Sequence, residues 1–209
     1  MNKLDLESHC NGQAPGSGTQ PVEKAIPFFL KVLQIITCMI GTRPEILEVG
    51  AGNGWNTKEL HRVSKLKWIV TDAQKHEPSY CPINVLKAKD AINNYINKWN
   101  TLLMVSPTPN VPWSLDAIKH AMTVKDHFFL IFFGEMGHSD GSPGTDRFLD
   151  EPDNGFKRLF MKPYMDITFK PPPGMAEQGN MMYQILMMMG SLGTPNKKFV
   201  YLYEFTKKP

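Results

Sequence analysis

A glycine-rich turn at residues 48–54, with the sequence EVGAGNG, restricts the folds that this chain can adopt. The turn follows the strand-like run Glu45–Val49 and precedes a helical pattern over 55–64. Alternate glycines let the backbone bend sharply, and they let a ligand approach the main chain without meeting a Cβ atom. This order of strand, glycine turn and helix is typical of the first unit of a nucleotide-binding α/β domain, although similar turns also occur in α/β proteins without a cofactor.

An acidic residue closes the next expected strand. The segment 67–72 has the pattern of a strand and ends on Asp72. In a doubly wound sheet the carboxyl ends of the parallel strands line the ligand crevice, so Asp72 is placed to accept hydrogen bonds from ribose hydroxyls. A cap on the following segment is the alternative role of Asp72.

The chain continues to alternate strand-like and helical segments as far as residue 134. The expected helices cover 21–41, 55–64, 90–99 and 115–124, and the expected strands cover 45–49, 67–72, 83–88, 101–106 and 127–134. This alternation predicts an α/β fold with a doubly wound, mostly parallel sheet. Further on, 161–170 is apolar, 181–189 fits a strand or a helix, and Phe199–Thr206 predicts a strand. The methionines between 161 and 189 indicate core filling or an adaptable pocket.

Length and composition favour one folded domain. The chain has 209 residues, of which 42% are hydrophobic and 21% charged, close to globular averages. Residues 1–20 contain few large apolar groups and are expected to form a flexible tail ahead of a single domain over 21–209. The net charge of +3 is too small to indicate a polyanionic partner by itself. Small basic groups, such as the one within 61–67, usually mark a solvated face, and an RNA contact is the alternative.

The cysteines and the N-terminal segment bear on the compartment. Cys10, Cys38 and Cys81 form neither a CxxC pair nor a zinc-binding spacing, which favours a reducing compartment and disfavours a structural metal. Residues 1–20 lack the apolar core of a signal peptide. The apolar stretch 26–40 is shorter than the ~20 residues that a membrane span needs. We therefore expect a cytoplasmic protein that does not span a membrane.

The EVGAGNG segment, Asp72 and the later Asp90-Ala91 pair together resemble the class I S-adenosylmethionine-dependent methyltransferases, whose first motif reads acidic-x-Gly-x-Gly-x-Gly. The resemblance covers residues 40–135, and the segment from Phe199 is similar to the final antiparallel strand of that family. It implies S-adenosylmethionine as the cofactor, with Asp72 at the ribose and Asp90 at the adenine amine, a helix N-cap being the alternative role of Asp90. The residues implied for cofactor binding are Glu48, Gly50, Ala51, Gly52, Asn53, Gly54, Asp72, Asp90, Ala91 and Ser106.

Other glycine motifs fit less well. A dinucleotide fold needs Gly-x-Gly-x-x-Gly, and Trp55 stands where the third glycine would be. A phosphate-binding P-loop is excluded because no Gly-Lys-Ser/Thr follows the turn. The chain also departs from the methyltransferase pattern at 73–89, which leaves little room for the usual helix between the second and third strands. The strand order there and the role of Asp90 stay open.

Methyl transfer from a sulfonium needs alignment of the reacting atoms and, for some acceptors, a base. The segment from Ser106 to Trp113 is loosely similar to a motif of amino methyltransferases, in which a polar side chain holds the amine and an aromatic ring stacks on the acceptor. The polar loop after residue 134 adds Glu135 and His138, and His138 is a candidate proton acceptor because imidazole titrates near neutrality. We expect Ser106, Glu135 and His138 as catalytic residues and Trp113 as a substrate-binding residue, all lining one pocket. A proline-stiffened connection and a flexible polar loop are the alternatives.

The sequence thus predicts a methyltransferase whose acceptor is unidentified and is RNA, a protein or a small molecule. A methyltransferase-like binding or scaffold protein without transfer activity is one alternative, favoured by the short second connection and the altered segment after Ser106. A nucleotide-cofactor oxidoreductase is the other, and the spacing of the glycines disfavours it.

Overall fold

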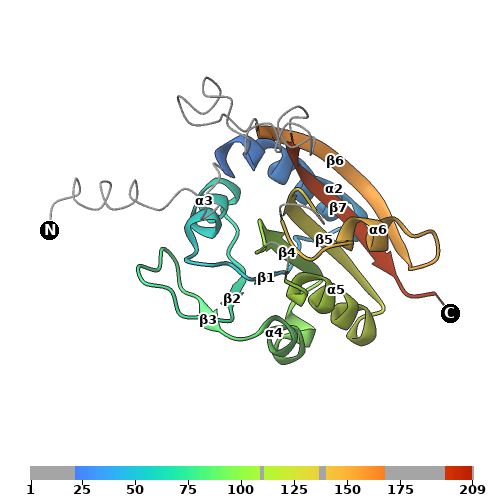
Figure 1. The fold of residues 1–209 in the computed structure, drawn as a ribbon, viewed down its shortest axis with the longest axis horizontal. Coiled ribbons are helices and arrows are strands. Elements are labelled where there is room, and N and C mark those ends of the chain that lie inside the picture. Colours follow the sequence, from blue (N-terminus) through green and yellow to red (C-terminus); the bar gives the residue numbers. More distant parts are fainter. Residues whose placement is uncertain (1–21, 109–110, 137–139, 168–195, 209) are drawn as a thin grey trace, which may run out of the picture.

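The structure of the protein is a computed structural model that describes residues 22–108, 111–136, 140–167 and 196–208. A seven-stranded sheet with the strand order β3-β2-β1-β4-β5-β7-β6 forms its centre (Figure 1). The strands are β1 (Ile46–Val49), β2 (Ile69–Asp72), β3 (Asn84–Val85), β4 (Thr101–Val105), β5 (His127–Gly134), β6 (Phe156–Ile167) and β7 (Asn196–Thr206). The helices are α2 (Ile26–Ile40), α3 (Trp55–Ser64), α4 (Ala88–Asn94), α5 (Trp113–Val124) and α6 (Thr145–Asp150), with short 3-10 turns η1 (Val22–Ala25) and η2 (Ile96–Lys98). The tail expected at 1–20 and the apolar segment 181–189 lie outside the described residues.

Five of the strands are parallel. β1 pairs with β2 and β4, β2 pairs with β3, and β4 pairs with β5, all in the parallel sense. β7 runs antiparallel to both of its neighbours, β5 and β6. The predicted α/β class, the mostly parallel sheet and the antiparallel last strand are therefore confirmed.

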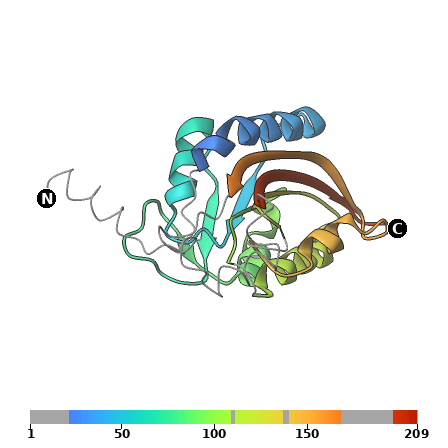
Figure 2. The ribbon, with the colours of Figure 1, turned by 45° about the horizontal axis from the view of Figure 1, so that its top comes forward.

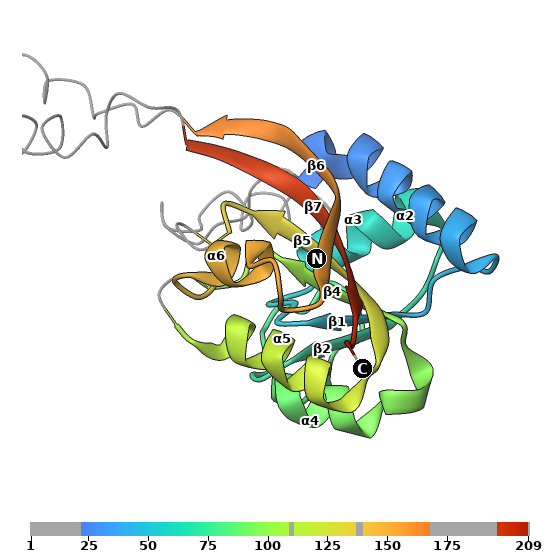
Figure 3. The ribbon, with the colours of Figure 1, turned by 90° about the vertical axis from the view of Figure 1, so that its right-hand side faces the viewer.

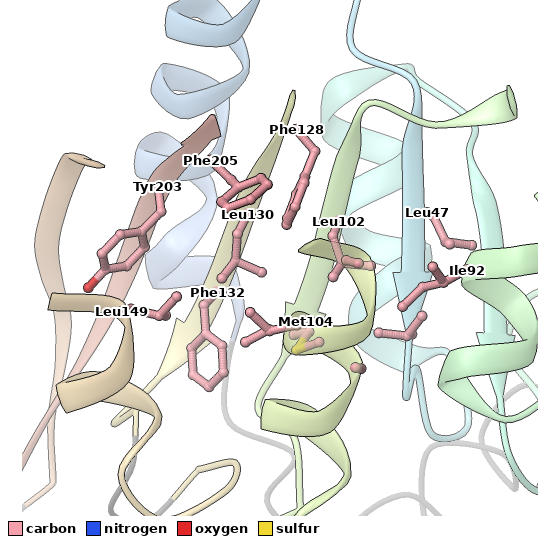
Figure 4. Packing of buried hydrophobic residues seen from close by; sticks show 14 of the residues in the cluster. Leu47, Ile92, Leu102, Met104, Phe128, Leu130, Phe132, Leu149, Tyr203 and Phe205 are labelled. Atoms are coloured by element: carbon pink, nitrogen blue, oxygen red, sulfur yellow. The ribbon is translucent and has the colours of Figure 1, made fainter. Parts of the chain in front are cut away.

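Helices cover both faces of the sheet (Figure 2). α2 and α3 pack on one face, and α4, α5 and α6 pack on the other, each face with its own hydrophobic cluster. The clusters meet at β5. Its residues Phe128, Leu130 and Phe132 belong to the cluster under α5 (Figure 4). The alternate residues Phe129, Ile131 and Phe133 belong to the cluster under α2. Burial of both faces explains why the sequence of β5 is an uninterrupted apolar run.

β6 and β7 form a long pair at one end of the sheet (Figure 3). Their ladder is irregular between Arg158 and Phe160 and again between Pro163 and Met165. The second irregularity includes Tyr164, whose side chain is buried in the cluster under α2. A β-bulge changes the direction in which nearby side chains point, and this one lies near the end of β6.

Several element boundaries differ from the sequence-based expectation. β3 has two residues rather than the run 83–88, because α4 already begins at Ala88. α5 begins at Trp113 rather than at residue 115, with Pro112 just before it, a position that suits the fixed φ of proline. α6 was not predicted, since only Thr145 and Leu149 of its residues are buried and the apolar period is weak.

The connection between β2 and β3 contains no helix over residues 73–83, and yet the strand order β3-β2-β1 is kept. The connection that looked short in the sequence therefore lacks a crossover helix, but the order of the strands is unaffected. Among the described residues, none of the helices combines the length and the apolar character that crossing a membrane requires.

Candidate functional site

A cavity of about 950 Å³ lies at the carboxyl ends of β1, β2 and β4. Its volume falls within the ~300–1,000 Å³ typical of small-molecule sites. The sequence-predicted residues that line it are Gly50, Ala51, Gly52, Asn53, Asp72, Asp90, Ser106 and Trp113. Four other predicted residues, Glu48, Gly54, Ala91 and Glu135, are not among its lining residues, and His138 lies outside the described part of the chain.

The glycine loop forms one wall of the cavity. Gly50 and Gly52 have φ angles of +72° and +59°, the left-handed region that favours glycine. A Cβ atom on Gly52 would meet no atom within 4 Å, whereas one on Gly50 would lie 2.4 Å from Cη2 of Trp113. Gly50 is therefore required by the packing of Trp113, and Gly52 presents bare main chain to open space.

Asp72 joins the glycine loop to the loop that follows β2. Its Oδ2 atom accepts a hydrogen bond from the N–H of Gly52 at 2.8 Å. Its Oδ1 atom accepts one from the N–H of Gln74 at 2.9 Å and lies 3.1 Å from Nε2 of His76. The bond to Gln74 is the cap on the following segment that was the alternative role of Asp72. The same carboxylate also lines the cavity, so capping and ligand binding are compatible here.

Glu48 serves the core rather than the cavity wall. It is 1% exposed, and its carboxylate accepts hydrogen bonds from Oγ1 of Thr57 at 2.9 Å and from Nε1 of Trp68 at 2.8 Å. These donors come from α3 and from the residue just before β2, so Glu48 ties β1 to α3 and to the beginning of the next strand. Burial raises the pKa of Glu48 to about 7, because desolvation outweighs the two hydrogen bonds that favour the ionised form.

Asp90 and Ala91 separate in the structure. Asp90 lies in the first turn of α4, is exposed and lines the cavity, whereas the N-cap position belongs to Lys87. The alternative role of Asp90 as the helix cap is therefore wrong. Ala91 is fully buried in the core beneath α4, and its side chain packs there instead of facing the cavity.

Ser106 follows β4 with a φ of +46°, a conformation that non-glycine residues rarely adopt and that is frequent at functional sites. Its N–H donates to the carbonyl of Phe133 at 2.9 Å, and its side chain lies next to Tyr164 of β6. Burial, together with the charge of Asp140, raises the pKa of Tyr164 well above its ordinary value. Ser106 itself lines the cavity, with Tyr164 as its buried neighbour.

A buried ion pair lies beyond Ser106 at the same edge of the sheet. Nζ of Lys198 lies 2.9 Å from Oδ2 of Asp140, and both side chains are 5% exposed. The same Oδ2 accepts a hydrogen bond from the N–H of Glu135 at 2.9 Å. Glu135 therefore lies beside Asp140 and Lys198, whereas Ser106 and Trp113 line the cavity. Ser106, Trp113, Glu135 and His138 were expected to line one pocket. Among the described residues, only Ser106 and Trp113 do so.

Trp55 and His76 are among the cavity residues that the sequence did not point to. Trp55, the first residue of α3, is 36% exposed and lies edge-on to Tyr80, with Nζ of Lys58 5.5 Å from the centroid of its ring. Its place directly after the glycine turn was the available signal. His76 lies in the helix-free loop 73–83. The sequence showed that this segment departs from the methyltransferase pattern, but it indicated no role for any residue there.

No family model matches the chain, and no curated protein sequence matches it. Solved structures do match. The plantazolicin methyltransferase BpumL in complex with SAH is 10% identical, with a TM-score of 0.50, and the match covers 98% of this chain and 90% of that chain. The cofactor-bound protein Rv0187 from MTB is 9% identical, with a TM-score of 0.50, over 99% of this chain and 89% of that chain. At these identities the likeness shows the fold alone, and that fold is the class I methyltransferase-like fold.

Proposed function

We propose that this protein is an S-adenosylmethionine-dependent methyltransferase that binds its cofactor in the cavity beside the glycine loop. The observation that carries the proposal is the bond between the N–H of Gly52 and Oδ2 of Asp72 at 2.8 Å. It brings the main chain of the glycine loop and an acidic strand end to one cavity, which is the combination expected for a ribose-containing ligand. The solved structures of the same fold, one of which is a methyltransferase in complex with SAH, support the choice of cofactor.

The residues of the cavity fit this cofactor. Gly52 offers close approach because a Cβ atom there would point into open space, Asp72 offers a carboxylate acceptor to a hydroxyl group, and exposed Asp90 offers one to an amine. When bound, S-adenosylmethionine supplies a methyl group already activated by a sulfonium. The protein then contributes alignment of the acceptor, which is worth several kcal/mol in well-oriented reactions.

The proposed acceptor is an amine on a nucleobase or a protein. Ser106 supports this choice because it follows β4 with a strained backbone, φ +46°, and lines the cavity with a polar hydroxyl. The indole of Trp113 lines the same cavity and favours a planar or cationic acceptor through stacking. We propose His138 as the group that takes up the acceptor proton, because imidazole titrates near neutrality, whereas Glu135 of the same loop lies beside Asp140 instead of lining the cavity.

Calorimetric titration with S-adenosylhomocysteine tests the cofactor assignment. We expect Asp72→Ala to weaken binding tenfold to a hundredfold, since hydrogen bonds to a charged group are worth ~1.5–3 kcal/mol. Asp126→Ala, at an exposed aspartate that pairs with Lys207 far from the cavity, is the matched control and should bind like the wild type. Equal affinity of the two variants would contradict the assignment.

Turnover separates an enzyme from a scaffold. The wild-type protein is incubated with labelled S-adenosylmethionine and fractionated cellular RNA, protein and metabolites, and both labelled product and S-adenosylhomocysteine are measured. Transfer into one fraction identifies the acceptor class. Cofactor binding without transfer into any fraction would favour the scaffold alternative.

A further inference from the structure

The helix-free loop 73–83 lies against the proposed cofactor cavity. β2 and β3 pair directly, with Asp72 opposite Val85, so the loop has to return within a short distance. The N–H of Tyr80 donates to the carbonyl of Asn53 in the glycine loop at 2.9 Å, which pins the loop to that wall. His76 lines the cavity as a result, with 35% of its side chain exposed.

The acceptor capacity of Asp72 is nearly used up before any ligand is considered. An ionised carboxylate offers about four lone-pair sites, two on each oxygen. Oδ1 faces the N–H of Gln74 and Nε2 of His76, and Oδ2 faces the N–H of Gly52. Only one site remains, although a ribose brings two adjacent hydroxyls.

The three partners of Asp72 are not equally replaceable. The bonds from Gly52 and Gln74 are main-chain bonds that hold the two loops in place. His76 is a half-exposed side chain whose bond of 3.1 Å is the longest of the three. Its charged neighbours in the loop, Lys75 and Glu77, pair with each other at 2.9 Å and are largely exposed. His76 is therefore the partner that can exchange Asp72 for a ligand hydroxyl.

We propose that His76 is a second ribose-binding residue, which takes one of the two hydroxyls while Asp72 takes the other. A neutral imidazole carries one donor and one acceptor nitrogen, so it can bond a hydroxyl in either sense. The inference rests on the proposed function and adds a contact that depends on the missing crossover helix of this chain. A helix between β2 and β3 would carry the chain away from the cavity, whereas the loop returns His76 to it.

A variant-by-ligand cycle tests the proposal in calorimetric titrations. The ligands are S-adenosylhomocysteine and its 2′-deoxy and 3′-deoxy ribose analogues, and the proteins are the wild type, His76→Ala and His76→Gln. We expect His76→Ala to weaken S-adenosylhomocysteine about tenfold, or ~1.4 kcal/mol. It should weaken one of the two deoxy analogues less than about twofold, because that analogue lacks the hydroxyl that His76 would bind. His76→Gln keeps an N–H donor on a side chain of similar reach and should recover most of the affinity.

Lys75→Ala, in the same loop and 79% exposed, is the matched control and should bind all three ligands like the wild type. Equal weakening of all three ligands by His76→Ala would overturn the proposal, because a loss of loop structure has that effect and a lost hydroxyl contact does not. Unchanged affinity for S-adenosylhomocysteine would also overturn it. A wild-type protein that binds none of the three ligands would overturn the proposed function and this inference with it, which distinguishes the two failures.

Discussion

The indole ring of Trp113 lies directly against Gly50, so closely that a Cβ atom on Gly50 would stand 2.4 Å from Cη2 of the ring. The contact joins the first residue of α5 to the first glycine of the loop after β1. It makes one wall of the cavity a packed unit, in which the loop and the helix hold each other.

Gly50→Ala is expected to lower the free energy of unfolding by ~2–5 kcal/mol. The left-handed φ of +72° costs a residue with a Cβ atom about 1–2 kcal/mol, and the overlap with Trp113 adds about 1–3 kcal/mol. In a Trp113→Leu background the overlap is relieved and only the backbone cost should remain, which urea denaturation of the four proteins measures. Strict additivity of the two substitutions would show that the contact carries no strain.

Gly52→Ala and Gly41→Ala form a matched pair for the open face of the loop. Both glycines have left-handed φ angles, +59° and +74°, and a Cβ atom on either would meet nothing within 4 Å. Each substitution should therefore cost about 1–2 kcal/mol of stability. Only Gly52→Ala should weaken S-adenosylhomocysteine, by more than about tenfold, because only Gly52 lines the cavity. Calorimetry showing the same affinity for both variants would remove the glycine loop from the binding site.

Glu48 gives the stability of the protein a definite pH dependence. Its pKa is raised from 4.5 to about 7 in the folded protein, so the folded state holds a proton that the unfolded state releases between these values. The stabilising contribution is complete below pH 4.5 and is lost as the pH rises to about 7, by at most ~3 kcal/mol. The difference in unfolding free energy between Glu48→Gln and the wild type should thus increase by ~2–3 kcal/mol from pH 5 to pH 8, in favour of the variant.

Exposed Glu45 supplies the control for that series, and Glu45→Gln should change the unfolding free energy by less than about 0.5 kcal/mol across the range. Glu48→Gln should also keep its affinity for S-adenosylhomocysteine within about twofold, because the carboxylate bonds Thr57 and Trp68 instead of lining the cavity. A flat difference between pH 5 and pH 8 would mean that Glu48 ionises as easily in the folded state as in the unfolded chain.

Lys198→Met is expected to destabilise the protein by ~3–5 kcal/mol, because it leaves the buried carboxylate of Asp140 without its cation. Adding Asp140→Asn should restore part of the loss, since the uncompensated charge is then removed. The neighbouring exposed Lys197 provides the comparison, and Lys197→Met should cost no more than about 1 kcal/mol. Thermal or urea unfolding measures all three. A loss below about 1 kcal/mol for Lys198→Met would show that water reaches the pair.

The features that local sequence patterns determine were predictable. The parallel strands, α3 and the glycine loop follow from short-range periodicity and from the glycine positions, and Asp72 follows from ending a strand in a parallel sheet. β5 was predicted with its bounds, because a strand buried on both faces has an apolar run with no interruption.

The features that depend on distant partners were not predictable. Asp140 and Lys198 are 58 positions apart, and only the insertion of β7 beside β5 brings them together. The side chain of Glu48 turns toward Trp68 and Thr57 for a similar reason, since both donors come from elements that the motif itself does not include. The packing of the domain, and not the motif, therefore determines which neighbouring residues a motif side chain bonds.

The position of β7 between β5 and β6 has a consequence for how this protein is made. β7 follows all the other described strands in the chain, and yet it supplies the hydrogen-bonding partner of β5 from His127 to Gly134 as well as that of β6. A nascent chain that ends before residue 196 therefore carries an aromatic strand with one unpaired side and a long β6 that has not joined the sheet. Such exposed edges are templates for aggregation, and pairing between distant strands is slow to form. Three of the seven strands, β5, β6 and β7, can accordingly complete their pairing only after residues 196–206 have been synthesised, and until then chaperones protect chains with such open edges.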